Sequence, residues 1–301
     1  MVQRSVEIVE VGPRDGLQNE SIHVATADKV ALVARALAYG IRRIEVASFV
    51  NPRRVPQMAD AEAVVAALPE RDDATWIGLV LNERGAERAL ATRIDQLGAV
   101  TVSTDSFAMR NQGQTSDESV AVAIRIAALA HAAGRTAQAT IASSFGCPFE
   151  GEVDPDHVVA MAVRMAEAGM VEIALADTIG VAVPAQVSSL VARVAAAIAP
   201  LPVRVHLHDT RNTGIANVWA AVEAGAATID AALGGLGGCP FAPGAAGNVA
   251  TEDTVYMLER SGVATGLDLD AVIGASNWLS GIMGKPLPGR LARTGGFPKP
   301  A

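Results

Sequence analysis

The stretch Val203-Arg-Val-His-Leu-His-Asp-Thr210 begins with a strand candidate, Val203–Leu207, and leads into an alanine-rich helical stretch, Gly214–Ala224. Short β-branched runs are typical of buried strands, and the alanine-rich run that follows is typical of a helix. Gly225 comes directly after that helix and is the residue type that most easily adopts the left-handed conformation found there. The stretch therefore predicts one unit of strand, loop and helix.

The same unit recurs from one end of the chain to the other. The eight strand candidates are Val6–Val11, Arg43–Ala47, Thr75–Leu81, Ala99–Ser103, Thr136–Ala142, Val171–Leu175, Val203–Leu207 and Thr228–Leu233. The helix candidates between and after them are Thr26–Tyr39, Met58–Leu68, Glu83–Ala91, Asp117–Ala133, Pro155–Ala168, Pro184–Ala199, Gly214–Ala224 and Thr251–Arg260. This alternation predicts an α/β fold, a parallel TIM (β/α)8 barrel.

An open doubly wound sheet is the alternative arrangement of alternating strands and helices. Such sheets usually carry a Gly-x-Gly-x-x-Gly motif between the first strand and the first helix. At that place this chain has Gly12-Pro-Arg-Asp-Gly16, which has a different spacing and a different chemistry. The absence of this motif after the first strand therefore favours the barrel over the open sheet.

Length and composition agree with one barrel. The chain has 301 residues, of which 50% are apolar and only 4% aromatic, and this suits helices packed closely on a buried sheet. We expect a single catalytic domain over residues 1–301, in which residues from about 264 to 301 form a C-terminal helical extension and tail. Asp268–Met283 is the helix expected in that extension.

Charge and cysteine content restrict the partners and the compartment. The formal net charge of −8 disfavours nucleic acid and anionic membranes, because both select for a basic face. No apolar run reaches the ~18 residues of a membrane span. Only two cysteines are present, and the N-terminal Met1-Val-Gln-Arg-Ser5 lacks the apolar core of a signal peptide. We expect a cytoplasmic protein.

Polar residues gather where the predicted strands end. In a barrel of this type, the loops after the strands form the active face. The polar groups at these ends include Arg14-Asp15, Glu45, Ser48, Ser103, Asp105, Ser106, Asp177-Thr178, His206, His208 and Asp209. After the last strand comes a glycine-rich loop, Gly234–Asp253, which presents Cys239, Asn248 and Glu252. We expect the functional site at this end of the barrel.

His206 and His208 are two positions apart on one strand. This spacing points both imidazoles into the barrel near its mouth. Two histidines on one face favour a metal site, for which Asp15 and Asn248 are the best oxygen donors on facing loops. Nitrogen and oxygen ligands with open positions suit Mg²⁺ or Mn²⁺ better than a structural zinc site, although zinc stays an alternative. Cys239 lacks a second thiol nearby and is not placed on the metal.

The dipeptide Arg14-Asp15 combines a permanent cation with a carboxylate. Such a pair can both hold a metal and stabilise a developing oxyanion. A simple surface ion pair is the alternative, but the surrounding Gly12-Pro13 and Gly16 predict a turn that determines where the pair points.

Six motifs in order closely resemble the 3-hydroxy-3-methylglutaryl-CoA lyase family, a group of metal-dependent barrel carbon–carbon lyases, over about residues 5 to 285. They are Val11–Glu20, Ile44–Val50, Gly146–Gly151, Asp177–Gly180, His206–Thr210 and Gly234–Asp253. The resemblance implies a divalent cation, Mg²⁺ or Mn²⁺, on Asp15, His206, His208 and Asn248. It also implies cleavage of 3-hydroxy-3-methylglutaryl-CoA to acetyl-CoA and acetoacetate, the chemistry of leucine degradation and ketone bodies. An acyl-CoA thioester partner and a homodimer or higher homo-oligomer are implied as well.

The resemblance also implies roles for individual residues. Asp15 is implied as the base that removes the hydroxyl proton, and Arg14 as the stabiliser of the enolate oxygen. His206 is implied to share in proton transfer, and the sequence leaves the division of that role among Asp15, His206 and Cys239 open. Cys239 is implied in proton transfer from a lid over the substrate. Three acidic residues are implied to orient the metal ligands, namely Glu45, Asp177 and Glu252.

Three departures from the family pattern leave the acyl group open. Gln138 stands where the familiar lyases have an arginine, Ser21 stands where a lysine often follows Asn-Glu, and the loop Thr104–Asn111 differs. The alternatives are a related 3-hydroxy-3-alkylglutaryl-CoA lyase, a pyruvate-dependent aldolase or Claisen synthase of the same barrel group, and a non-catalytic acyl-CoA-binding barrel. For CoA itself, scattered basic contacts such as Arg53 or Arg110 are expected.

Overall fold

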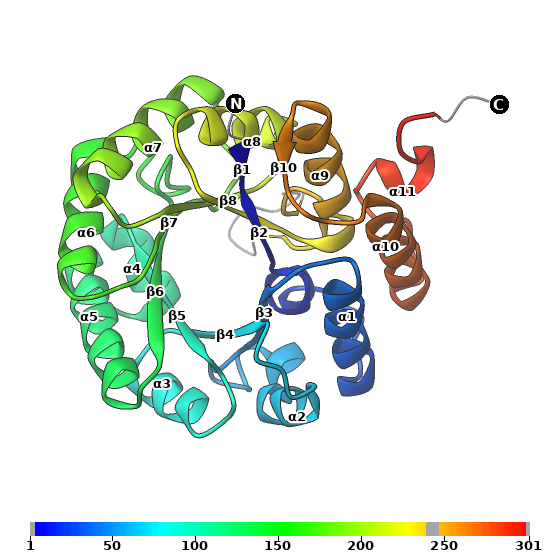
Figure 1. Ribbon diagram of the computed structural model, residues 1–301. Coiled ribbons are helices and arrows are strands. Elements are labelled where there is room, and N and C mark those ends of the chain that lie inside the picture. Colours follow the sequence, from blue (N-terminus) through cyan, green and yellow to red (C-terminus); the bar gives the residue numbers. More distant parts are fainter. Residues whose placement is uncertain (1–3, 239–246, 299–301) are drawn as a thin grey trace.

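The computed structural model describes residues 4–238 and 247–298. Its central feature is a closed barrel in which eight parallel strands pair in chain order, β2-β3-β4-β5-β6-β7-β8-β9. Figure 1 looks along the barrel and shows the helices as a ring around the strands. The strands are β2 (Glu7–Glu10), β3 (Arg43–Ser48), β4 (Thr75–Val80), β5 (Gln96–Val102), β6 (Thr136–Ala142), β7 (Ile173–Asp177), β8 (Val203–Leu207) and β9 (Thr228–Ala231). The TIM barrel prediction is confirmed, and the open sheet is wrong because β2 pairs with β9.

Every predicted helix is present, with ends that differ by up to three residues. They are α1 (Thr26–Ala38), α2 (Ala61–Ala67), α3 (Glu83–Leu90), α5 (Ser116–Ala132), α6 (Pro155–Glu167), α7 (Pro184–Ile198), α8 (Gly214–Glu223) and α9 (Thr251–Arg260). Gly225, with φ of 101°, has the left-handed conformation expected after α8. None of the helices in the described part of the chain has both the length and the apolar content needed to span a bilayer.

Some elements were not predicted. The segment expected as a loop, Thr104–Asn111, is largely a helix, α4 (Asp105–Gln112), which ends at Gly113 with a φ of 74°. Its polar sequence lacks an apolar stripe, and periodicity alone therefore misses it. Near the N-terminus, β1 (Arg4–Ser5) pairs with β10 (Val263–Ala264) in a separate two-stranded sheet.

The predicted C-terminal helix is α10 (Leu269–Met283), capped by the Asp268 side chain, which accepts a hydrogen bond from the Ala271 amide at 3.2 Å. Figure 1 shows α10 outside the ring of barrel helices, beside α1 and α9. A short helix, α11 (Leu291–Thr294), follows it. The extension therefore covers the barrel beside the place where β2 and β9 close it.

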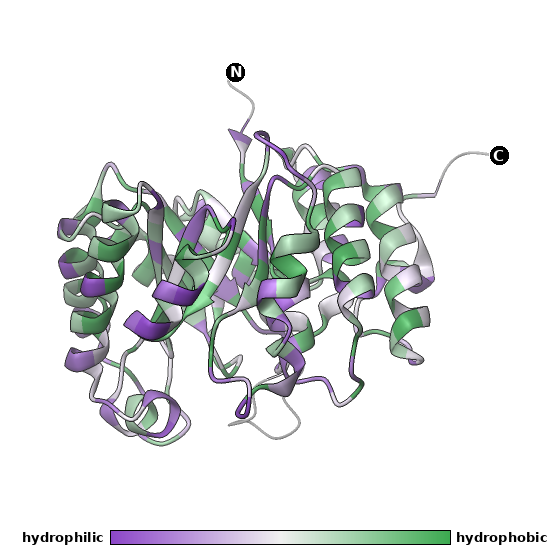
Figure 2. Ribbon diagram, turned by 90° about the horizontal axis from the view of Figure 1, so that it is seen from below, coloured by the Kyte–Doolittle hydropathy of each residue, from purple (hydrophilic) through white to green (hydrophobic). Residues whose placement is uncertain are grey.

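The core lies between the strands and the helix ring. Figure 2 shows hydrophobic and hydrophilic residues sharing the same helices, as expected for helices with one face on the sheet. Inside the barrel the side chains are unusually polar, and buried charges are rare in proteins unless they are paired. The buried ionisable residues on the barrel strands and their ends are Glu10, Arg14, Glu45, Glu172, Asp177, Arg204, His206, His208 and Asp230. This interior is the natural place to look for a site.

Glu10, at the end of β2, joins several loops at the barrel mouth. Its fully buried carboxylate accepts hydrogen bonds from the Gly12 amide (2.8 Å), the Leu233 amide (2.8 Å), the Tyr39 hydroxyl (2.7 Å) and the Thr251 hydroxyl (2.8 Å). Burial raises the pKa of Glu10, although these four donors act in the opposite direction. One carboxylate thus ties the turn after β2 to the start of the glycine loop and to α9.

We expect Glu10→Ala to lower the free energy of unfolding by at least about 3 kcal/mol, because it leaves four buried donors without an acceptor. Urea unfolding followed by circular dichroism measures the change. Glu87→Ala, on the exposed face of α3, is the control and should change stability by less than about 0.5 kcal/mol. Equal stability of the two variants would show that the Glu10 contacts are dispensable.

Candidate active site

A cavity of about 690 Å³ opens at the carboxyl ends of the barrel strands. Five of the residues proposed as catalytic groups or metal ligands line it, Arg14, Asp15, Glu45, His206 and His208. These residues come from the turn after β2, from β3 and from β8. The barrel therefore brings together groups that are far apart in the sequence.

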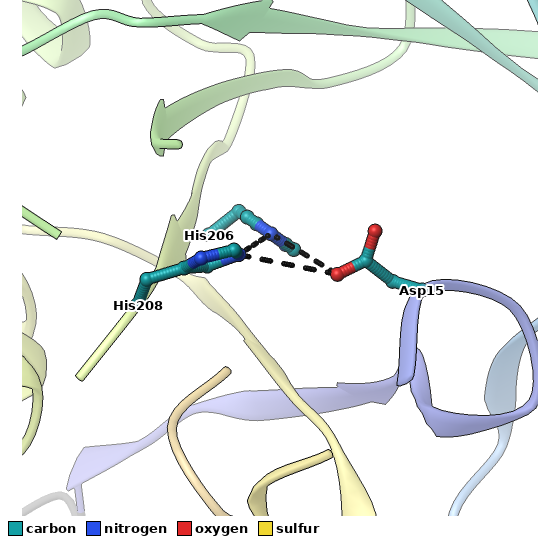
Figure 3. Close-up of side chains that lie close together, drawn as sticks. All are labelled: Asp15, His206 and His208. Atoms are coloured by element: carbon teal, nitrogen blue, oxygen red, sulfur yellow. Dashed lines mark hydrogen bonds and ion pairs between the residues drawn. The ribbon is translucent and has the colours of Figure 1, made fainter. Parts of the chain in front are cut away.

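His206 and His208 point toward Asp15 across the mouth of the barrel (Figure 3). The two Nε2 atoms lie 3.1 Å apart, and the Asp15 Oδ2 atom lies 3.7 Å from Nε2 of His206 and 3.9 Å from Nε2 of His208. Two imidazole nitrogens bound at right angles to one ion would lie roughly 3 Å apart, since each metal–nitrogen bond is about 2.1 Å long. The three side chains thus have the spacing of a metal site.

Asp15 lies in the helical turn Gly12–Gly16, where its amide donates to the Val11 carbonyl at 2.7 Å. Arg14 pairs with the Asp15 carboxylate and, at 2.7 Å, with Glu45. Burial raises the pKa of Asp15, but the Arg14 guanidinium and the two histidines outweigh it and hold that pKa well below its usual range. Asp15 is therefore ionised, as a metal ligand must be.

The two histidines differ in their surroundings. Burial, reinforced by the neighbouring His206, lowers the pKa of His208 to about 4. Burial also opposes the charging of His206, but its hydrogen bond to Asp230 and the charge of Asp15 raise its pKa overall. Because the His206 Nδ1 atom faces Asp230 at 3.0 Å, the neutral ring carries its proton there and leaves a lone pair on Nε2. The two Nε2 atoms lie 3.1 Å apart, a separation at which they either share one proton in a hydrogen bond or bind one cation.

Asn248 completes the predicted ligand set. Its side-chain amide donates to Asp15 Oδ2 at 2.7 Å and to the Leu236 carbonyl at 3.0 Å. Its Oδ1 atom is buried and has no hydrogen-bond partner within residues 4–238 and 247–298. A buried unpaired oxygen on a side chain that contacts Asp15 fits a divalent cation that prefers oxygen and nitrogen. Coordination by Asn248 stays a prediction.

The other proposed acidic residues hold loops. Both oxygens of Asp177 accept backbone hydrogen bonds, from Val181 at 2.9 Å and from Ala182 at 3.0 Å. Glu252 accepts from the Gly234 amide at 3.0 Å and from the Ser276 hydroxyl at 2.7 Å. Neither is among the side chains that line the cavity in the described part of the chain. Their predicted role in orienting the ligands would therefore act through these loops.

Cys239 lies outside the described residues, so its predicted role stays a prediction. Two residues near the candidate ligands were missed. Asp230 contacts the His206 ring, and the Arg204 Nε–H donates to the Asp230 carboxylate. The sequence contains a pattern that could have predicted each of them. Arg204 lies two positions before His206 and therefore on the same face of the strand, and Asp230 is an acidic residue within a buried strand. Both residues lie further down the barrel than the polar groups at the strand ends, which formed the predicted site.

Fold and site define a class of protein, a parallel (β/α)8 barrel with two histidines and a carboxylate at its carboxyl-end mouth. The profile of the HMGL-like family matches residues 5–279. The chain belongs to this family, which confirms the resemblance seen in its motifs.

Individual relatives cover nearly the whole chain. It is 44% identical to the (R)-citramalyl-CoA lyase of Chloroflexus aurantiacus, over 97% of this chain and 95% of that protein. It is 38% identical to the hydroxymethylglutaryl-CoA lyase YngG of Bacillus subtilis, over 95% of this chain and 96% of that protein. Among solved structures, an HMG-CoA lyase from Acinetobacter baumannii in complex with coenzyme A and 3-methylmalate superposes with a TM-score of 0.94 at 38% identity, covering 100% of this chain and 99% of that one.

The ligand geometry predicts the effect of removing a ligand. We expect Asp15→Ala and His208→Ala each to weaken Mn²⁺ binding by more than about 100-fold, because each removes one of three converging ligand atoms. Electron paramagnetic resonance of free Mn²⁺ during a titration measures the affinity. His23→Ala, an exposed histidine, is the control and should bind as the wild type does. Unaltered binding by either site variant would remove that residue from the ligand set.

The buried carboxyl of Glu252 should make the stability of the folded protein depend on pH. Burial raises its pKa to about 7 from the usual value of 4.5, with the nearby Asp253 adding to the effect. Because the folded pKa is the higher one, the contribution of Glu252 to stability is complete at pH values below the unfolded pKa and is lost as the pH rises toward 7. We expect Glu252→Gln, which stays neutral, to gain stability relative to the wild type over this range, by at most about 3 kcal/mol.

Urea unfolding at several pH values measures this difference. The control is Glu167→Gln, an exposed residue near the end of α6, for which the difference from the wild type should not vary with pH. A constant difference for Glu252→Gln would mean that the carboxyl is already ionised in the folded protein.

Proposed function

We propose that this chain is a metal-dependent lyase that cleaves a carbon–carbon bond in a 3-hydroxy-3-methyl acyl-CoA thioester. The observation that carries the proposal is the convergence of Asp15, His206 and His208, with Arg14 directly beside them in the same cavity. Membership of the HMGL-like family and the names of the curated relatives support it. The first candidate substrate is 3-hydroxy-3-methylglutaryl-CoA, with acetyl-CoA and acetoacetate as products.

In this retro-Claisen reaction the C3 hydroxyl loses its proton, the bond between C2 and C3 breaks, and C3 becomes a ketone. The electron pair moves to C2 and onto the thioester oxygen as an enolate, which is then protonated to the acetyl thioester. A divalent cation on Asp15, His206, His208 and Asn248 would supply Lewis acidity that makes the hydroxyl easier to deprotonate. The chain's own residues must accept the proton, stabilise the enolate and return a proton.

Asp15 is the candidate base, although its pKa is held well below the usual range. Such a weak base can accept the proton only from an acidified hydroxyl, which makes it dependent on the cation. Arg14 is suited to the enolate, because Glu45 and Asp15 hold its guanidinium in one place. The Arg14 Nε atom is buried without a hydrogen-bond partner in the described part of the chain. The Arg14 residue lines the cavity. Cys239 would return the proton to C2.

A second candidate substrate is (R)-citramalyl-CoA, favoured by the 44% identity to the Chloroflexus aurantiacus protein. Its acyl chain is one methylene shorter than that of 3-hydroxy-3-methylglutaryl-CoA. The same bond cleavage then gives acetyl-CoA and pyruvate. The ligand set and Arg14 serve both substrates equally, so the choice depends on how the cavity holds the far carboxylate.

Four arginines line the cavity, Arg14, Arg54, Arg110 and Arg204. Arg14 and Arg204 are held in buried ion pairs, so Arg54 and Arg110 are the candidates for contact with the CoA moiety. Arg54 takes the place proposed for its neighbour Arg53, which is not among the lining residues. The Arg110 guanidinium lies over the Phe149 ring at 3.9 Å. We propose that these two cations contact the phosphates of CoA.

The proposal is tested with purified protein, Mg²⁺ or Mn²⁺, and a series of thioesters. The series contains 3-hydroxy-3-methylglutaryl-CoA, (R)-citramalyl-CoA and longer 3-hydroxy-3-alkylglutaryl-CoA. We expect acetyl-CoA from at least one of them, together with acetoacetate, pyruvate or the matching 3-keto acid, and no turnover in chelator. Chromatography of the CoA products measures cleavage. Full activity without metal, or no cleavage of any thioester by metal-loaded protein, would overturn the proposal.

Cys239→Ser gives a separate prediction. If Cys239 transfers a proton to the departing acetyl unit, its loss should lower kcat by roughly 100- to 10,000-fold and leave Mn²⁺ binding intact. Cys147→Ser is the matched control, because Cys147 is buried against Thr104, at 3.1 Å, rather than in the cavity. Equal activity of the two variants would exclude Cys239 from proton transfer.

A further inference from the structure

A row of buried charges runs through the barrel beneath the candidate metal ligands. Arg204 on β8 and Asp230 on β9 belong to it, and their side chains are 1% and 3% exposed. The register of the two strands places His206 opposite Asp230 and Arg204 opposite Thr228. Charges this deeply buried are costly unless each has a fixed partner, which makes their arrangement informative.

Asp230 divides its two oxygens between two partners. Oδ1 accepts a hydrogen bond from the Arg204 Nε–H, and Oδ2 lies 3.0 Å from the Nδ1 atom of His206. The His206 ring is therefore held from the side away from Asp15. A carboxylate that accepts from Nδ1–H selects the tautomer with a free lone pair on Nε2, the atom that faces His208 and Asp15.

Arg204 also lies close to a second carboxylate, that of Glu172. Its Nη1 atom lies 3.7 Å from the Glu172 carboxylate. Glu172 is in turn bound by Arg43 at 2.7 Å and by the Thr228 hydroxyl at 2.7 Å. The planar guanidinium thus lies between two carboxylates and cannot swing away from Asp230 without breaking buried ion pairs.

His208 offers a contrast within the same site. Its Nδ1 atom is buried and has no hydrogen-bond partner in the described part of the chain. Only one of the two rings is therefore oriented by a carboxylate.

We propose that Arg204 and Asp230 are positioning residues that fix the tautomer and direction of the His206 ring. The consequence for metal affinity rests on the proposed function, whereas the orientation of the ring does not. The competing explanation is charge balance, in which Arg204 serves only to neutralise Asp230 and Glu172. The two explanations differ when both charges are removed together, because balance is then restored while orientation is still lost.

The experiment compares the wild type with Asp230→Asn, Arg204→Lys and the double variant Arg204→Met/Asp230→Asn. Nitrogen chemical shifts of the histidine rings report the tautomer in metal-free protein, recorded at a pH above the raised pKa of His206 so that its ring is neutral. Mn²⁺ titration reports affinity, and steady-state kinetics separate kcat from KM. Lys29→Met is the control, because it breaks a buried ion pair with Asp60 (2.6 Å) away from the cavity. It should lose stability and keep the wild-type tautomer and Mn²⁺ affinity.

We expect a single Nδ1–H tautomer of His206 in the wild type and a mixture in Asp230→Asn and in the double variant. Mn²⁺ affinity should fall about 10- to 100-fold in both, with a larger effect on kcat than on KM, and less in Arg204→Lys. The inference is overturned if Asp230→Asn keeps one tautomer, or if the double variant recovers wild-type affinity. A wild type with one tautomer but neither Mn²⁺ binding nor turnover would instead overturn the proposed function.

Discussion

The pairing of β2 with β9 is the contact on which the site depends. It closes the barrel, so the turn after β2 comes to lie beside the end of β8. Asp15 then reaches the histidines, with its Oδ2 atom 3.7 Å from His206 and 3.9 Å from His208. In an open sheet β2 would lie at an edge, and no carboxylate from this turn would meet β8. Closure thus creates the only group of converging metal-ligand atoms found in the described residues.

Bringing these charges together has a cost that the fold must offset. Buried ions are tolerated only when each is paired, and at this mouth nearly every ion is. Arg14 lies between Asp15 and Glu45, while Arg204 lies between Asp230 and Glu172. The site is therefore rigid before any ligand arrives, because rotation of one side chain would leave its partner unpaired. Such preorganisation is what electrostatic catalysis requires.

The candidate site joins residues that the motifs indicated to buried charges that they did not. Arg14, Asp15 and the two histidines meet in the way that the motifs of the family implied. Below them, the guanidinium that donates a hydrogen bond to Asp230 belongs to Arg204 on β8, a residue that the motifs did not indicate. Arg204 and Asp230 line the cavity beside His206, so the proposed reactive groups and the buried charges that hold them form one connected network. The named relatives of this chain act on two different acyl groups, as their names state.

The order of strands and helices followed from the sequence alone, because hydrophobic periodicity and helix-ending glycines are local properties. The inward direction of His206 and His208 also followed from the sequence, because the alternation of side chains between the two faces of a strand is a local property. Only the tertiary structure decided that Asp230 holds the His206 ring, that Glu10 ties loops from opposite ends of the chain, and that Asp177 and Glu252 bind backbone amides. The helix α4 was missed for a related reason, as its polar sequence lacks a periodic signal. The contacts of Asp177 with Val181 and Ala182 are local, but the other missed contacts join residues far apart in the sequence, and the tertiary fold rather than any local pattern sets which of them meet.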